Sequence, residues 1–186
     1  MEYINRNPLI VCICGKARSG KNTVSNYFGD LFIKDNKKVI VSPYTKYLKK
    51  YIEDILGESI TEENKPRDLL QNLSKDVIKG ILNDEDFFIR RQIEDINFYS
   101  YFCDVIIIND VRFPKEIEVL RDKYDNVISI GIERNNFASD LTEEEKNDIT
   151  EVSLDNYTEY DYVIENSDFE NLYDAVLEIF EDISKE

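Results

Sequence analysis

Histidine is missing from the whole sequence of 186 residues. Without it, the chain cannot form a serine-histidine triad, cannot use an imidazole as a general base and cannot bind zinc through imidazole nitrogens. Whatever chemistry the protein performs must therefore come from lysine, arginine, carboxylates or a bound metal ion.

Cysteine and long apolar segments are also scarce. The three cysteines, Cys12, Cys14 and Cys103, lie in apolar runs and form no C-x-x-C pair, so we expect buried free thiols in a reducing cytoplasm. Residues 1–8 are polar, and no apolar run approaches the length of a membrane-spanning helix. The sequence therefore predicts a cytoplasmic protein with no signal peptide and no membrane partner.

Positive charge is in short supply, because 23 lysines and arginines face 39 aspartates and glutamates and the net charge is -16. A protein that coats nucleic acid or an anionic membrane needs an electropositive face, so we expect no nucleic acid polymer as a partner. An anionic small molecule would have to be bound by a few local cations. Only eight arginines are available for this: Arg6, Arg18, Arg67, Arg90, Arg91, Arg112, Arg121 and Arg134.

The length fits a single domain that covers residues 1–186. Five short apolar segments are expected to be strands, with helical patterns between them, at residues 9–14, 38–41, 105–108, 127–132 and 162–164. This alternation predicts a three-layer α/β fold with a mainly parallel five-stranded sheet. Ligands of such folds bind at the carboxyl ends of the strands, where Gly15 and Asp110 fall.

Two insertions interrupt the alternation. Residues 57–97 show only helical patterns, and a helix over 67–82 would place Leu70, Val77 and Ile81 on one apolar side. Residues 133–158 are polar and acidic and are too long for an ordinary connection, which is typical of a lid. We therefore expect a helical region and a lid-like insert beside the sheet.

A phosphate-binding loop follows the first strand. Residues 15–21, GKARSGK, match G-x-x-x-x-G-K between a buried strand and an amphipathic helix. In this geometry, backbone N–H groups and the helix N-terminus surround a phosphate, and Lys21 reaches the β- and γ-phosphates of a nucleotide. The alternative is a glycine-containing turn that binds nothing, but a turn with two lysines and an arginine is costly unless an anion fills it.

The residues expected near a metal ion depart from the common pattern. Most loops of this kind have serine or threonine after the lysine, where the hydroxyl binds Mg²⁺, whereas this chain has Asn22 followed by Thr23. The Asn22 carbonyl oxygen can contact Mg²⁺ directly or through a water. Asp110 follows the strand at 105–108 and is placed to hold the metal. Capping of a helix that starts at Pro114 is the alternative, and the two roles are compatible.

Two motifs together resemble those of the P-loop deoxynucleoside monophosphate kinases typical of tailed bacteriophages. GKARSGKNT at residues 15–23 resembles their loop, G-K-x-x-S-G-K-[DN]-T, and DVRFPKE at 110–116 resembles their strand end, D-V-R-F-P-[NK]-E. Less specific matches cover most of the length: YTKYLKKYIEDILG, RDLLQNL and ITEVSLDNYTEYDYVIEN. The resemblance implies the P-loop kinase fold and transfer of the γ-phosphate of ATP to a (deoxy)nucleoside monophosphate, with Mg²⁺ as cofactor.

The resemblance also implies roles for individual residues. ATP and Mg²⁺ would be bound by Gly15, Lys16, Ala17, Arg18, Ser19, Gly20, Lys21, Asn22, Thr23 and, near the adenine, Asn166. Lys21, Asp110 and Arg112 would act in catalysis, with Asn22 and Asp110 at the metal. The nucleoside monophosphate would be bound at the helical region, residues 57–97, and we assign to this acceptor Arg67, Gln71, Lys49 and Arg134.

Two segments depart from the family's pattern, and other functions stay open. ITE at residues 149–151 stands where the family often has a histidine, and Ser74-Lys75 replaces the usual G-T near the acceptor, so the base preference is open. The alternatives are a P-loop kinase of the phosphomevalonate or dephospho-coenzyme A type, a non-kinase ATPase, and a catalytically silent binding module. The oligomeric state, a homodimer included, is open as well.

Overall fold

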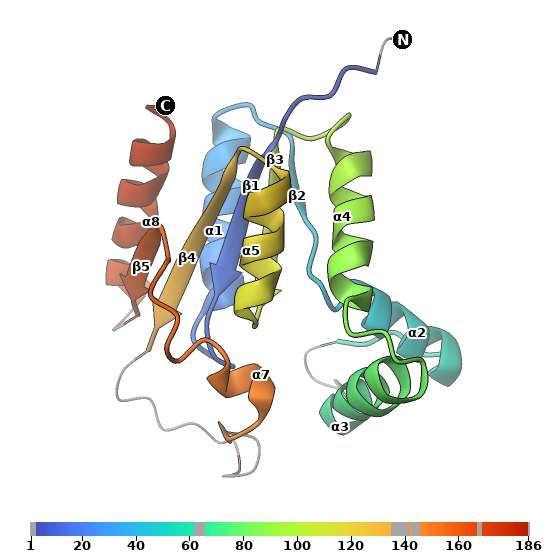
Figure 1. The fold of residues 1–186 in the computed structure, drawn as a ribbon. Coiled ribbons are helices and arrows are strands. Elements are labelled where there is room, and N and C mark those ends of the chain that lie inside the picture. Colours follow the sequence, from blue (N-terminus) through green and yellow to red (C-terminus); the bar gives the residue numbers. More distant parts are fainter. Residues whose placement is uncertain (1–2, 62–65, 135–141, 143–145, 167–168, 186) are drawn as a thin grey trace.

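The computed structural model describes residues 3–61, 66–134, 142, 146–166 and 169–185 (Figure 1). Its strands are β1 (Leu9–Cys14), β2 (Val39–Val41), β3 (Val105–Val111), β4 (Val127–Glu133) and β5 (Tyr162–Glu165). Its helices are α1 (Lys21–Lys34), α2 (Lys46–Leu56), α3 (Arg67–Asn72), η1 (Leu73–Ile81), α4 (Phe87–Tyr99), α5 (Pro114–Lys123), α7 (Ile149–Val152) and α8 (Phe169–Ile183).

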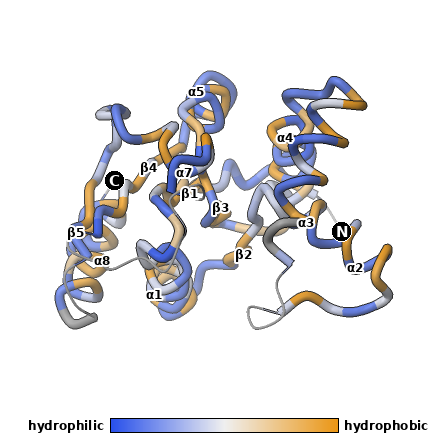
Figure 2. Tube along the Cα trace, turned by 90° about the horizontal axis from the view of Figure 1, so that it is seen from below, coloured by the Kyte–Doolittle hydropathy of each residue, from blue (hydrophilic) through white to orange (hydrophobic). Residues whose placement is uncertain are grey.

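The sheet has the order β2-β3-β1-β4-β5, and every neighbouring pair is parallel. Because the strands are parallel, each connection has to cross a face of the sheet, and helices cover both faces. Figure 2 shows α1 on one side of the row of strands and α5 and α4 on the other. The predicted three-layer fold with a parallel five-stranded sheet is confirmed.

The central strand β1 is buried on both faces because its apolar side chains alternate between two cores. Val11 and Ile13 pack with residues of α1 and α8, whereas Ile10, Cys12 and Cys14 pack with residues of α4 and α5. The described cysteines are free and buried, as the sequence predicted. The phosphate-binding loop predicted at residues 15–21, the P-loop, therefore leaves the sheet from its central strand.

A bulge in β3 lies opposite the start of the P-loop. Ile108 pairs with Cys12, but the next paired residue of β3 is Val111, which lies opposite Cys14. β3 thus has one more residue than β1 in this interval, and it continues three residues beyond the predicted end at Ile108. Asp110 lies inside this bulge, and bulges of this kind redirect a side chain at the end of a strand.

The predicted helix over residues 67–82 has two parts. It is α-helical through α3 and becomes π-helical in η1, where the Leu82 N–H donates to the Val77 carbonyl, five residues back, at 2.8 Å. The wider turns rotate Ile81 away from the apolar side where we expected it, and this residue is 77% exposed, whereas Ile78 is buried. This region has a small core of its own, made by Leu48, Ile52, Leu70 and Ile78.

Part of the lid-like insert expected at residues 133–158 lies outside the described residues, namely 135–141 and 143–145. The described part contains α7 and the connection from α7 to β5 (Figure 1). No described helix has the length and apolar character needed to cross a bilayer.

Two glycine substitutions should change stability in opposite directions. A Cβ at Gly131 would lie 2.8 Å from the Tyr160 ring, so Gly131→Ala forces that ring away from β4 and should lower the free energy of unfolding by about 1–3 kcal/mol. A Cβ at Gly29 in α1 would meet no atom within 4 Å, so Gly29→Ala should raise it by up to about 1 kcal/mol through helix propensity. Urea denaturation measures both, and similar effects at the two positions would contradict the packing of Tyr160 on β4.

Candidate functional site

The P-loop connects β1 to α1 and has two glycines that its geometry requires. Gly15 has a φ of 144° and Gly20 a φ of 106°, a region that other residues rarely adopt. A Cβ at Gly15 would lie 2.8 Å from the Ile132 carbonyl oxygen, and one at Gly20 would lie 2.6 Å from Nδ2 of Asn166. The loop is therefore held between the ends of β4 and β5.

Lys21 is the first residue of α1, and its ammonium group lies inside the loop. The side chain is buried, and Nζ donates to the carbonyl oxygens of Gly15 at 2.8 Å and Lys16 at 2.6 Å. Burial, followed by repulsion from Arg112, lowers its pKa from 10.5 to about 7, while Glu151 acts in the opposite direction. The loop thus holds a cation whose charge an added anion would stabilise.

A carboxylate of α7 lies against the P-loop. Oε2 of Glu151 accepts the backbone N–H of Ala17 at 2.6 Å, and Oε1 accepts from the Arg112 guanidinium at 2.8 Å. Arg112 also donates to the Thr150 carbonyl at 3.4 Å, so the end of β3, the P-loop and α7 meet around one anionic group. These donors are the kind that bind phosphate oxygens.

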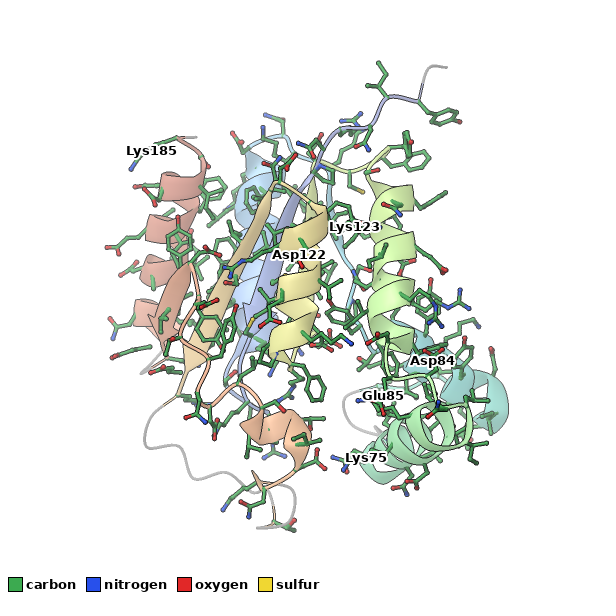
Figure 3. All side chains as sticks on the ribbon, viewed as in Figure 1. Lys75, Asp84, Glu85, Asp122, Lys123 and Lys185 are labelled. Atoms are coloured by element: carbon green, nitrogen blue, oxygen red, sulfur yellow. The ribbon has the colours of Figure 1, made fainter. Side chains whose placement is uncertain are left out.

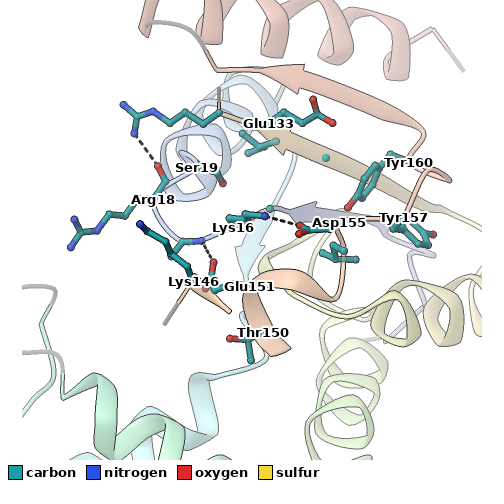
Figure 4. A pocket seen from close by; sticks show the side chains of 16 residues that line it. Lys16, Arg18, Ser19, Glu133, Lys146, Thr150, Glu151, Asp155, Tyr157 and Tyr160 are labelled. Carbon is teal, nitrogen blue, oxygen red and sulfur yellow. Dashed lines mark hydrogen bonds and ion pairs between the residues drawn. The ribbon is translucent and has the colours of Figure 1, made fainter. Parts of the chain in front are cut away.

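A cavity of about 520 Å³ opens beside this carboxylate (Figure 4). Lys16 forms an ion pair with Asp155 at 2.7 Å across it, and Arg134 donates to the Arg18 carbonyl at 2.9 Å at its rim. Ser19 is one of the residues that line the cavity. Its hydroxyl is buried and has no hydrogen-bond partner among the described residues. The cavity is lined by the P-loop, the end of β4 and the 146–160 segment, including Lys146, Leu154, Tyr157 and Tyr160.

Asp110 holds the start of α2. Its Oδ1 accepts the Tyr44 N–H at 2.7 Å, and its Oδ2 accepts the N–H of Thr45 at 3.1 Å and the Thr45 hydroxyl at 2.6 Å. The capping role considered from the sequence was placed at the wrong helix, because the carboxylate binds the N-terminus of α2 and not the helix that begins at Pro114. Its role at a metal stays a prediction.

The oxygen donors near the loop can be compared with the needs of Mg²⁺. Asn22 lies exposed in the first turn of α1, and its Oδ1 accepts from Nδ2 of Asn109, the residue before Asp110, at 3.2 Å. Within the described residues, no three acidic or thiol side chains gather into a metal-binding cluster. Mg²⁺ commonly takes one or two protein oxygens and completes its shell with water and phosphate. The amide oxygen of Asn22 and the carboxylate of Asp110 have the donor chemistry that such an ion needs, and their place at a metal stays a prediction.

Glu116 is a site residue that sequence reasoning did not single out. It is buried in α5, and its Oε2 accepts the N–H groups of Arg112 at 2.7 Å and Phe113 at 3.1 Å. The carboxyl thereby fixes the turn that carries Arg112. Burial is the main reason that its pKa rises from 4.5 to about 7. The signal was present, because Glu116 is the last residue of the DVRFPKE motif.

The remaining predicted residues fall into two groups. Asn166 follows β5 and donates from Nδ2 to the Ser19 carbonyl at 2.7 Å, so it braces the P-loop. Lys49 and Gln71 lie half-buried in α2 and α3, and the side chain of Arg67 lies outside the described part of the chain. Arg134, assigned from the sequence to the acceptor, lines the cavity beside the P-loop.

Comparison with known proteins establishes the fold. The sequence matches no family model and no curated protein. The structure is similar to shikimate kinase from Aquifex aeolicus, with 15% identity, a TM-score of 0.52 and coverage of 95% of this chain and 97% of that chain. It is also similar to shikimate kinase from Acinetobacter baumannii in complex with shikimate, with 15% identity, a TM-score of 0.51 and coverage of 96% and 93%. The chain therefore has the P-loop kinase fold.

Binding of MgATP should take up protons through Lys21. At about pH 8 a group with a pKa of about 7 is mostly neutral, and a phosphate placed beside it raises that pKa, so binding draws a proton from solvent. Isothermal titration calorimetry in two buffers of different ionisation enthalpy measures the uptake. Lys21→Arg is the matched control, because arginine keeps its proton at this pH and should abolish most of the uptake. Equal uptake by both proteins would assign the proton to another group.

The buried carboxyl of Glu116 should make stability pH-dependent. The folded state holds its proton more tightly than the unfolded state, so its contribution is full below about pH 4.5 and is lost as the pH rises through about 7. The difference corresponds to about 3 kcal/mol. Relative to Glu116→Gln, whose amide oxygen can still accept both N–H groups, the wild-type protein should lose stability over this range.

Urea denaturation at several pH values across this range measures the difference between the two proteins. Glu118→Gln, on the exposed face of the same helix, is the control and should show no such trend. A constant difference between wild type and Glu116→Gln would mean that Glu116 stays ionised in the folded protein.

Proposed function

We propose that this protein transfers the γ-phosphate of ATP to a nucleoside monophosphate, deoxynucleotides included, and releases ADP and the nucleoside diphosphate. One observation carries the proposal: the P-loop already binds an anionic group, the Glu151 carboxylate, through the Ala17 N–H and the Arg112 guanidinium. The resemblance of residues 15–23 and 110–116 to the phage-type kinases supplies the substrate class.

ATP is assigned to the P-loop and the cavity beside it. Residues 15–23 supply backbone N–H groups, the Lys21 ammonium and the unpartnered hydroxyl of Ser19. Asn166, which braces the loop through Ser19, and Arg134, at the cavity rim, complete the nucleotide site. Arg134 is therefore reassigned in this proposal from the acceptor to the ATP side.

Phosphoryl transfer requires that the charge on the phosphates is neutralised and that the two substrates are aligned. A site without histidine can do both. An oxygen of the acceptor's phosphate attacks the γ-phosphorus, the bond to the β,γ-bridging oxygen breaks, and ADP leaves with its electrons. The acceptor phosphate is already an anion near neutral pH, so no side chain has to remove a proton. Lys21 and Arg112 offset the negative charge that builds up around the transferred group.

A divalent ion supplies charge stabilisation on the phosphate oxygens when it is bound. Asn22 and Asp110 would hold it, with Asn109 orienting the Asn22 amide. Asp110 would do so while its carboxylate also anchors α2, which ties the position of the acceptor region to the end of β3.

The nucleoside monophosphate is assigned to the helical region at residues 57–97. A small core packs α3 and η1 of this region against α2, which holds the region beside the sheet. Arg67, Gln71 and Lys49 are the residues that would contact the acceptor; an arginine fork binds a terminal phosphate through two parallel hydrogen bonds.

ADP release should depend on the added acceptor. In a coupled assay with MgATP, deoxynucleoside and ribonucleoside monophosphates should raise the rate by orders of magnitude over ATP alone, whereas shikimate, the ligand named for one structural neighbour, should not. Lys21→Ala should abolish the stimulated rate because the lost cation acts on the transition state. Stimulation by shikimate alone would move the function to a different small-molecule kinase, and a high rate without any acceptor would indicate an ATPase.

A further inference from the structure

A carboxylate of the chain itself occupies donors of the predicted phosphate site. We propose that Glu151 is an internal competitor for the P-loop, so that α7 keeps the nucleotide site closed until the phosphates of ATP displace this side chain. The inference rests on the proposed function, because it takes ATP as the ligand of the loop. It is an autoinhibitory contact between the end of β3, the P-loop and α7.

The first argument is that the Glu151 carboxylate uses groups that a phosphate needs. One oxygen accepts the Ala17 N–H and the other accepts from Arg112, and the side chain of Glu151 is only 11% exposed. A phosphate in the loop would bring a second anion against this carboxylate with little water between them. Two anions cannot share one N–H and one guanidinium at low cost, so the bound phosphate and the bound Glu151 exclude each other.

The second argument is that two other polar groups of the loop, the Lys21 ammonium and the Ser19 hydroxyl, do not bind the Glu151 carboxylate. The Lys21 ammonium donates inward, to the Gly15 and Lys16 carbonyl oxygens, and the Ser19 hydroxyl is buried without a partner among the described residues. The Glu151 carboxylate thus accepts hydrogen bonds from only some of the donors of the loop. A polyphosphate offers more oxygens than Glu151 and can win the competition.

The third argument is that α7 is tied to the acceptor region. Asp148 accepts the Thr150 N–H at 3.0 Å and the Thr150 hydroxyl at 2.8 Å, which stabilises the first turn of α7. The same carboxylate forms an ion pair with Lys75 of η1. Lys75 lies on the side of η1 that faces α7 (Figure 3). Withdrawal of Glu151 by movement of α7 must therefore break this ion pair or move η1.

This connection makes the closed state depend on both substrate regions. Any contact made only in the closed state shifts the population toward that state. The apparent association constant for ATP is then the intrinsic constant multiplied by the fraction of molecules that are open. Breaking the Lys75–Asp148 pair should then favour ATP binding, although Lys75 does not line the cavity. By reciprocity, ATP binding should loosen η1.

The test is the dissociation constant of MgATP, measured by calorimetry without acceptor. If the closed form holds about nine-tenths of the molecules, Glu151→Gln should bind MgATP about tenfold more tightly than wild type, because the competing charge is gone. Lys75→Ala should bind it about two- to fivefold more tightly, as expected for loss of a partly exposed ion pair. The dissociation constants for inorganic tripolyphosphate should rank wild type, Glu151→Gln and Lys75→Ala in the same order, because Glu151 competes for the groups that bind phosphate.

Matched controls separate this effect from a change in net charge. Glu94→Gln removes a carboxylate from α4, and Lys115→Ala breaks an exposed ion pair between α5 and Asp86. Neither residue lines the described cavity, and neither variant should change the affinity by more than about twofold. Thermal denaturation of every variant shows whether it is folded. Glu151→Asp is a second variant of the same position: it keeps the charge on a shorter side chain, so the closed state should be less stable than in wild type.

The outcomes distinguish this proposal from the proposed function. Unchanged or weaker binding of MgATP and tripolyphosphate by folded Glu151→Gln overturns the internal competitor, whatever the acceptor assay shows. Tighter binding by Glu151→Gln and Lys75→Ala supports it. If these variants bind more tightly but no nucleoside monophosphate stimulates ADP release, the kinase assignment fails and the closed state stands. If neither wild type nor Glu151→Gln binds MgATP or tripolyphosphate, both proposals fail.

Discussion

The parallel pairing of β1 with β3 on one side and β4 on the other is the constraint on which the site depends. This pairing brings three strand ends to the same edge of the sheet: the P-loop after Cys14, the bulge that carries Asp110, and the end of β4 at Glu133, which Arg134 follows. β1 can occupy the centre because its side chains are apolar toward both faces. Exchange of a core side chain for a polar one here would disturb every element of the site together.

Around this edge, a strongly acidic protein maintains a small cationic centre. Lys21 and Arg112 are its cations. Glu151 and Asp110 act to raise the pKa of Lys21, Glu151 pairs with the Arg112 guanidinium, and Glu116 accepts the backbone N–H of Arg112. Each carboxylate has a separate structural task, because Glu116 fixes the turn of Arg112, Asp110 anchors α2 and Glu151 closes the P-loop. The net charge of -16 therefore does not prevent anion binding, since a few oriented donors at short range decide it.

The sequence by itself determined the fold class, the sheet strands within a few residues and the P-loop. Those features are local. A strand that is apolar on both faces, a glycine pattern and a helical periodicity can each be recognised within about ten residues of sequence. The roles of Lys49, Gln71 and Arg67 are still predictions from the resemblance. The π-helical turns of η1 were not predicted, because a periodicity of apolar residues assumes a regular helix and misplaced Ile81.

Only the tertiary structure decided what the acidic residues around the site contact. Glu151 is 134 residues from Ala17, Asp110 is 66 residues from Tyr44, and Asp148 is 73 residues from Lys75, so no local pattern could join them. In a chain with 39 acidic residues, composition cannot tell a solvated carboxylate from one that binds a backbone N–H. That distinction depends on which strand ends and helices the folded sheet brings together, because a buried carboxylate is stable only where donors surround it.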